Sequence, residues 1–202
     1  MEQNMSKADD KKQIKRITLL NTAFDLFTTK GLHNTSISDI VEKAGVAKGT
    51  FYLYFKDKYD INTKLIAHKT SQLFDAATER MNKENLPDLK SKILFLINDL
   101  LDALSSNKTL LLFISKNLGL GFFRYAANSE NPDTQKFHEV YKSLLLLHGD
   151  TIKDPEIMLY MIIELIGGCC YSSILYNEPV PMEELKPYLL RTVSNIVDDF
   201  TV

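Results

Sequence analysis

Apolar residues recur every three or four positions along almost the whole 202-residue chain, and this spacing is typical of α-helices. No apolar/polar alternation continues long enough to predict a strand, because a half-buried strand needs a period of two. The pattern therefore predicts an all-α fold, with helices separated by segments that contain Gly, Pro, Asn or Asp. Helices are expected near residues 14–30, 36–44, 48–54, 57–82, 93–104, 108–117, 131–148, 155–176 and 182–200.

The chain divides into two parts by pattern and charge. Residues 1–60 contain ten Lys and Arg against eight Asp and Glu, whereas the whole chain has a net charge of −2. We expect residues 1–60 to form an N-terminal three-helix domain and residues 61–202 a larger helical domain. The positive excess of the first part has the sign that a DNA-binding segment needs, but it is too small to indicate nucleic acid by itself.

Residues 36–55 hold the most specific local pattern in the chain. Ser36, with Asp39 three residues later, resembles a capping box that opens a helix, and a second short helix follows from Lys48 after a glycine-containing turn. Two short helices joined by a tight turn are the geometry of a helix-turn-helix, whose second helix lies in the major groove of DNA. Phe51 and Phe55 are four residues apart and are expected to pack inwards together.

Polar groups are then left on the outer side of that second helix. Lys48 can reach a phosphate or a guanine edge, and Gly49 lets the protein backbone approach the DNA closely. The hydroxyl groups of Thr50, Tyr52 and Tyr54 can donate to phosphate oxygens. The end of a helical bundle with tyrosines at an interface is the alternative interpretation. The basic residues at the start of the chain fit either steering towards DNA or a solvated helix face: Lys7, Lys11, Lys12, Lys15 and Arg16.

This segment resembles the DNA-binding signature of the TetR family of transcriptional regulators over its whole length. The matching positions are Ile17, Ala23, Leu26, Phe27, Gly31, Thr35, Ser36, Ile40, Ala44, Gly45, Val46, Lys48, Gly49, Thr50, Tyr52, Tyr54, Phe55 and Lys58. The chain departs from many family members at Ala47, where they place Ser or Thr as a helix cap. We expect that cap to be lost, at a cost of about 1 kcal/mol.

The resemblance implies a function and a set of DNA contacts. It implies a homodimer that binds double-stranded operator DNA and is released when a small-molecule effector enters the C-terminal domain. Transferred by position, it implies phosphate contacts for Ser36, Ser38 and Lys58 and base contacts for Lys48 and Gly49. It also implies contacts to the DNA backbone for Thr50, Tyr52 and Tyr54. An activator, or an architectural DNA-binding protein without a ligand, stays open as an alternative.

The helix expected over residues 156–176 is apolar nearly all round and must be covered on every side. With the last helix, 182–200, it is expected to form a four-helix interface in a homodimer. Pro187 predicts that the regular part of that last helix begins only near this residue.

The apolar stretch from Ile157 to Tyr171 is shorter than the roughly twenty residues of a membrane helix. The polar start of the chain gives no signal segment, so we expect a cytoplasmic protein without a membrane partner.

A ligand pocket is expected among aromatic, flexible and polar residues of the second domain, although such residues at helical spacing also form ordinary cores. The candidates are Phe113, Asn117, Phe122, Phe123, His138, Tyr141, Met158, Met161 and Glu164. Their character suggests an apolar or amphipathic ligand. Glu164 fits a pair across the dimer, a contact with a cationic or amphipathic ligand, or an exposed edge.

No pattern in the sequence predicts an enzyme. The chain has no glycine-rich phosphate loop, and its two cysteines, Cys169 and Cys170, lie in an apolar stretch where burial makes a thiol a poor nucleophile. The four histidines lack metal-ligand spacing, so neither a metal nor a cofactor is expected.

Overall fold

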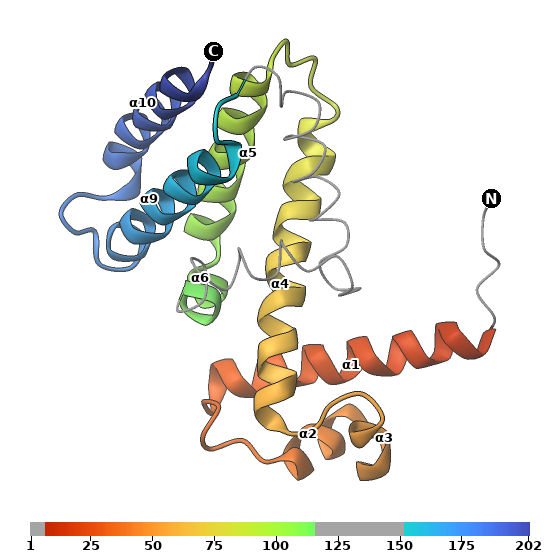
Figure 1. Cartoon of the computed structure of the whole chain (residues 1–202). Coiled ribbons are helices and arrows are strands. Elements are labelled where there is room, and N and C mark those ends of the chain that lie inside the picture. The colour runs from red at the N-terminus through yellow and green to blue at the C-terminus, as the bar shows by residue number, and fades with distance from the viewer. Residues whose placement is uncertain (1–6, 116–151) are drawn as a thin grey trace. The chain divides into compact units, whose positions relative to one another are not determined.

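The computed structural model describes residues 7–115 and 152–202, and the expected helix over residues 131–148 lies outside them. The described part is helical, as the periodicity predicts, and contains no strand, only an isolated antiparallel bridge between Ile152 and Thr201. Its elements are α1 (Lys7–Thr29), α2 (Ile37–Ala44), α3 (Lys48–Tyr52), α4 (Lys58–Met81), α5 (Leu89–Ser106), α6 (Lys108–Ile114), α9 (Pro155–Tyr176) and α10 (Met182–Phe200) (Figure 1). The chain divides into an N-terminal unit, Met1–Ile66, and a C-terminal unit, Ala67–Val202.

The N-terminal unit consists of α1, α2, α3 and the beginning of α4. Its helices start and stop at the expected signals: Gly31 follows α1 with a φ of 83°, and Gly45 ends α2 with a φ of 67°. Both values lie in the left-handed region, which glycine adopts without steric cost. The core of this unit is made by fully or almost fully buried side chains, among them Leu19, Leu20, Ala23, Ile40, Phe51, Phe55, Ile61 and Leu65.

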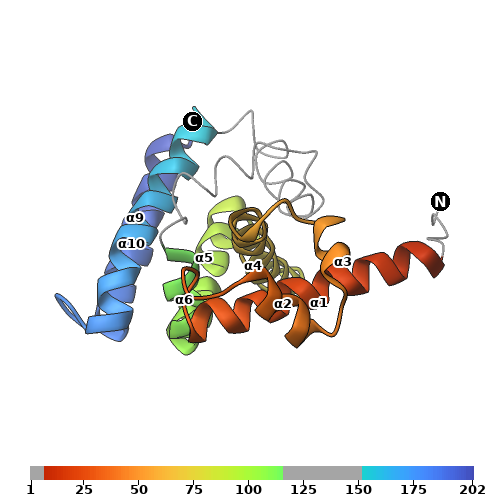
Figure 2. The same ribbon diagram turned by 90° about the horizontal axis from the view of Figure 1, so that it is seen from below.

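In the C-terminal unit, α9 and α10 lie side by side and α5 packs against both (Figures 1 and 2). Asp88 and Asn107 cap α5 and α6 by accepting hydrogen bonds from the backbone N–H groups of Ser91 (2.7 Å) and Leu110 (2.9 Å). The apolar faces of α5, α6, α9 and α10 meet in one core, whose fully buried members include Leu101, Leu111, Ile114, Met158, Cys170 and Val193.

The prediction that the regular part of the last helix begins near Pro187 is wrong. α10 begins at Met182, so that Pro187 lies inside the helix. Met182 and Leu189 are both buried, and their packing holds the first turns in place. The carbonyl of Glu183, which the missing N–H of Pro187 would have bonded, belongs to an exposed residue and can bond to water.

α9 is long and apolar enough to cross a membrane when judged by length and composition alone, a test that core helices also pass. It buries one face in the C-terminal unit through Met158, Ile162 and Cys170. The opposite face is exposed and includes Ile157 (54%) and Met161 (44%). A helix that is apolar all round is thus covered on one side by its own unit.

Candidate DNA-binding site

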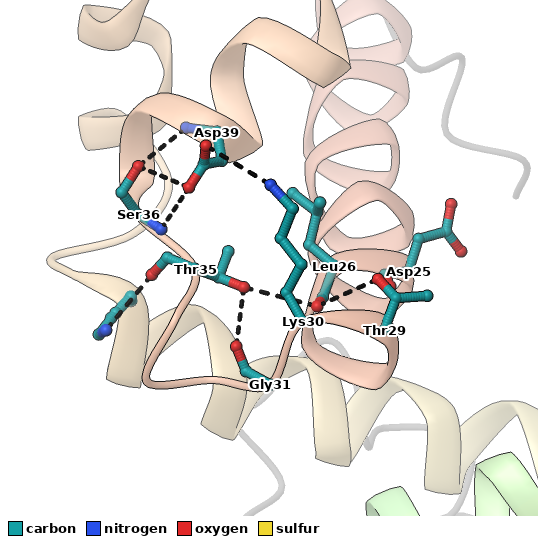
Figure 3. Close-up of polar contacts among 9 residues, drawn as sticks. Asp25, Leu26, Thr29, Lys30, Gly31, Thr35, Ser36 and Asp39 are labelled. Carbon is teal, nitrogen blue, oxygen red and sulfur yellow. Dashed lines mark hydrogen bonds and ion pairs between the residues drawn. The ribbon is translucent and has the colours of Figure 1, made fainter.

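The start of α2 is fixed by reciprocal hydrogen bonds between Ser36 and Asp39 (Figure 3). The Asp39 backbone N–H donates to Ser36 Oγ at 3.1 Å, and Asp39 Oδ2 accepts from the backbone N–H and the hydroxyl of Ser36, each at 2.8 Å. The backbone N–H of Ser36 lowers the pKa of the Asp39 carboxyl most, and the Ser36 hydroxyl and the Lys30 ammonium also lower it. The expected capping box is confirmed, and it satisfies N–H groups that helix geometry leaves without partners.

The loop between α1 and α2 is closed by a buried threonine. The hydroxyl of Thr35 donates to the carbonyl of Gly31 at 2.8 Å and to that of Leu26 at 3.5 Å, as Figure 3 shows. Thr35 is 1% exposed, so these hydrogen bonds are shielded from water. They hold the end of α1 close to the residue that precedes the cap of α2.

Lys58 ties the same loop to the start of α4. Its ammonium donates to the carbonyls of Leu32 (3.1 Å), His33 (3.0 Å) and Thr35 (3.3 Å), which lie 23 to 26 residues earlier in the chain. A lysine ammonium has three protons, so these carbonyls use all of its donors. The phosphate contact that the resemblance implies for Lys58 would therefore require the ammonium to leave at least one of them.

α3 packs against its unit through two phenylalanines. Phe51 is fully buried, Phe55 is 1% exposed, and their ring centroids are 5.5 Å apart, as the four-residue spacing predicts. The Lys64 ammonium lies over the Phe55 ring at 5.4 Å and donates to the carbonyl of Tyr54 at 3.1 Å. These contacts fix how α3 is rotated about its own axis and thereby decide which side chains it presents to solvent.

The structure places the expected contact residues in two groups. Ser36, Ser38, Lys48, Gly49 and Tyr52 are exposed, whereas Thr50, Tyr54 and Lys58 are half-buried. The N-cap of α3, Ala47, makes no side-chain cap hydrogen bond, as its methyl group predicts.

Leu53 is the residue of this surface that sequence reasoning missed, and its side chain is 79% exposed. Its position two residues after the buried Phe51 was the signal that could have revealed it, because residues i and i+2 of a helix point to nearly opposite sides. Against a DNA duplex, the exposed side chains of Lys48 and Tyr52 would find hydrogen-bond acceptors on base edges and phosphates. The exposed side chain of Leu53 could be covered only by apolar groups of the bases.

The expected pocket residues are only partly covered by the described structure. Asn117, Phe122, Phe123, His138 and Tyr141 lie outside the described residues. Phe113 is half-buried against the core of the C-terminal unit, and Met158 is fully buried. Met161 and Glu164 are exposed on α9. Among the described residues no group of His, Cys, Asp and Glu could hold a metal ion.

Comparison with known proteins agrees with this geometry. Residues 19–62 match the model of the family described as "Bacterial regulatory proteins, tetR family". The fatty acid metabolism regulator protein of Bacillus subtilis is 27% identical over 195 residues, which cover 95% of both chains.

Two solved structures are similar in fold. The transcriptional regulator FadR of Bacillus subtilis, in complex with stearoyl-CoA, has a TM-score of 0.60 at 21% identity and matches 90% of this chain and 98% of its own. A putative TetR-family regulator of Syntrophomonas wolfei has a TM-score of 0.63 at 23% identity and matches 92% and 95%. At these identities the two structures support the all-α fold alone.

Proposed function

We propose that this chain, a member of the TetR family of bacterial regulatory proteins, is a dimeric repressor that a small apolar or amphipathic molecule releases from its operator. That it is a DNA-binding transcriptional regulator, and not an enzyme, follows from the family match and from the relatives. Dimerisation, the repressor role and the class of effector are the proposed parts. Because its target would be operator DNA, we place the protein in the cytoplasm.

The observation that carries the proposal is the presentation of α3. Burial of Phe51 and Phe55 turns Lys48, Gly49 and Tyr52 outwards on a short helix that follows a capped α2, which is the arrangement of a helix-turn-helix. We propose that these three residues meet base edges and backbone, and that Ser36, Ser38, Thr50 and Tyr54 add contacts to phosphates. Lys58 contributes by positioning the α1–α2 loop.

The test is titration of the full chain against its own upstream intergenic DNA at two salt concentrations. The Lys48→Ala/Tyr52→Phe variant should lose most of the sequence-preferring affinity. Lys83→Ala removes an equal charge from an exposed position of the C-terminal unit and should bind as the parent chain does. Equal, weak binding of all three proteins to operator and random DNA would reject the proposal. Tight binding with little sequence preference would favour the architectural alternative.

The dimer proposal is supported by the exposed face of α9. Ile157, Met161, Glu164 and Gly168 lie along one stripe of that helix and are all exposed. Its two apolar side chains, Ile157 and Met161, are 54% and 44% exposed one helical turn apart, and exposed apolar surface of this kind is typical of a contact with another molecule. We propose that it pairs with its own copy, together with the outward face of α10.

Light scattering of Met161→Glu should give a monomeric mass, because the new carboxylate would be buried at the interface one helical turn from Glu164, a like charge. Asn85→Glu introduces the same side chain at an exposed loop residue and should stay dimeric. A monomeric parent chain at micromolar concentration would reject the dimer. Release would then have to act on a single N-terminal unit.

The effector class is suggested by the relatives. One is a regulator of fatty acid metabolism, and one fold neighbour was solved in complex with stearoyl-CoA. We therefore propose a long-chain acyl thioester as the first effector to test. Stearoyl-CoA below its micelle concentration should release operator DNA, whereas free CoA should not. An unchanged operator affinity at saturating stearoyl-CoA would exclude this class for the chain.

α4 offers a route for release, because this one helix begins in the N-terminal unit and ends in the C-terminal unit. We propose that a bound effector shifts α4 and with it the spacing of the two recognition helices in the dimer. Dimeric helix-turn-helix proteins read half-sites about 34–36 Å apart, so a shift of a few ångströms would lose the register. Operator affinity that saturating effector leaves unchanged would contradict this coupling.

A further inference from the structure

The side of α3 that faces furthest from its own unit is formed by Gly49 and Leu53. Each lies two residues from the fully buried Phe51, and at 100° per residue both are about 160° from it around the helix axis. Leu53 follows the last residue of α3 but has a φ of −71° and a ψ of −23°, so it continues the helical spacing. Lys48 and Tyr52 flank this outermost line.

Leu53 leaves most of its side chain in water. At 79% exposure it is among the most exposed large apolar residues of the described chain, whereas Tyr52 beside it is 54% exposed and carries a hydroxyl. Leucine can neither donate nor accept a hydrogen bond, so it gains little from phosphates or from polar base edges. Its gain would come from an apolar group that covers it, because free energy falls as apolar area leaves water.

The second observation concerns Gly49. Its φ lies outside the left-handed region, and a Cβ built on it would meet nothing within 4 Å. The fold therefore has no need for glycine here, and alanine, a better helix former, would fit the same backbone. A missing side chain that the chain itself does not require indicates close approach by a molecule outside the chain.

We propose that Leu53 reads a thymine in the operator by packing on its C5-methyl group, and that Gly49 leaves the space through which the base edge approaches. This inference rests on the proposed function, since it assigns a specificity role on the same recognition surface. In the major groove the methyl group of thymine is the apolar feature, while the other groups are hydrogen-bond donors and acceptors. Lys48 and Tyr52, on the flank, supply the polar contacts that orient the helix.

The experiment replaces each thymine of the selected operator by deoxyuridine, one position in each half-site at a time. Deoxyuridine keeps the base pair and removes the C5-methyl group alone. For the parent chain, deoxyuridine at one of the thymine positions should weaken binding about four-fold per half-site. This factor corresponds to the loss of one buried methyl contact. Leu53→Ala should bind the thymine operator more weakly and should be insensitive to deoxyuridine at that position.

Two further variants separate base contact from folding. Leu53→Met keeps an apolar side chain of similar volume and should retain part of the deoxyuridine sensitivity. Gly49→Ala should unfold at the same or a higher temperature than the parent chain, yet bind the operator more weakly, because its methyl group fills the approach to the base.

The outcomes distinguish this inference from the proposed function. If the parent chain shows no sequence preference, the regulator proposal fails and the thymine contact fails with it. If the parent chain prefers its operator but Leu53→Ala responds to every deoxyuridine as the parent does, the thymine contact is wrong and the regulator proposal stands. The contact is supported if Leu53→Ala loses the response to deoxyuridine at a single position, keeps the response at the other positions and unfolds at the same temperature as the parent chain.

Discussion

Replacing Lys58 by methionine should destabilise the N-terminal unit, because it removes the three hydrogen bonds that join the α1–α2 loop to α4. Methionine keeps most of the aliphatic stem and removes the ammonium. Two of the three acceptors, the carbonyls of Leu32 and Thr35, are partly buried, and the carbonyl of His33 is exposed. A hydrogen bond to a charged donor contributes about 1.5–3 kcal/mol, and the exposed carbonyl can return to water.

Counting the two partly buried carbonyls at the low end of that range, the expected loss is about 3 kcal/mol in the free energy of unfolding. For a chain of this size that loss should lower the unfolding midpoint by roughly 6–12 °C. Lys56→Met is the matched control. Lys56 is an exposed lysine two positions earlier, and its backbone N–H, not its side chain, bonds to Asp60 Oδ2 at 2.8 Å. Its unfolding midpoint should stay close to that of the parent chain.

The salt dependence of operator binding gives a second measurement on the same variants. Each lysine–phosphate contact contributes about one to the slope of log affinity against log salt concentration. With its protons on carbonyls, Lys58 should contribute little, so that Lys58→Met weakens binding with a nearly unchanged slope. A Lys58→Met protein as stable as Lys56→Met, with a slope reduced by about one per contact, would show that Lys58 serves as a phosphate ligand and would refute the reasoning.

The remaining predictions concern single groups. Ala47→Ser should raise, and Ser36→Ala should lower, the free energy of unfolding by about 1 kcal/mol each in thermal melts, since the first adds a helix cap and the second removes one. The lowered pKa of the Asp39 carboxyl stabilises the fold above the pKa of the unfolded chain, and this contribution is lost as pH falls through the folded value. Ser36→Ala keeps the backbone N–H, the largest cause, and removes the hydroxyl, so it should raise the pKa of Asp39 in part in an NMR titration; an unchanged value would contradict the contribution of the hydroxyl. Burial raises the pKa of the Cys170 thiol to about 12, so in the native protein at neutral pH a thiol reagent should modify the half-buried Cys169 first.

The candidate site was predictable where its signals are local. Ser36 and Asp39 lie three residues apart, and Phe51 and Phe55 four, so that helix geometry alone brings each pair together. The same holds for the missing cap at Ala47. Residues that face each other within one turn of helix can be found without knowing how the helices pack.

Features that depend on packing between distant segments were not accessible in this way. α9 is apolar nearly all round, so the sequence does not show which of its faces packs against the core of the C-terminal unit. That packing decides that the face with Met161 and Glu164 stays exposed. Pro187 sits inside α10 because tertiary packing of Met182 offsets a local preference that would begin the helix later.

The sequence by itself determined the helical class of the chain, the boundaries of α2 and the residues available to meet DNA, because periodicity, caps and turns act over three or four residues. The tertiary structure decided what those residues can do. It places the ammonium of Lys58 on carbonyls 23 to 26 residues away and, by burying Phe51, turns Leu53 towards solvent. Contacts of that range arise when helices pack, and one periodic pattern is compatible with several packings.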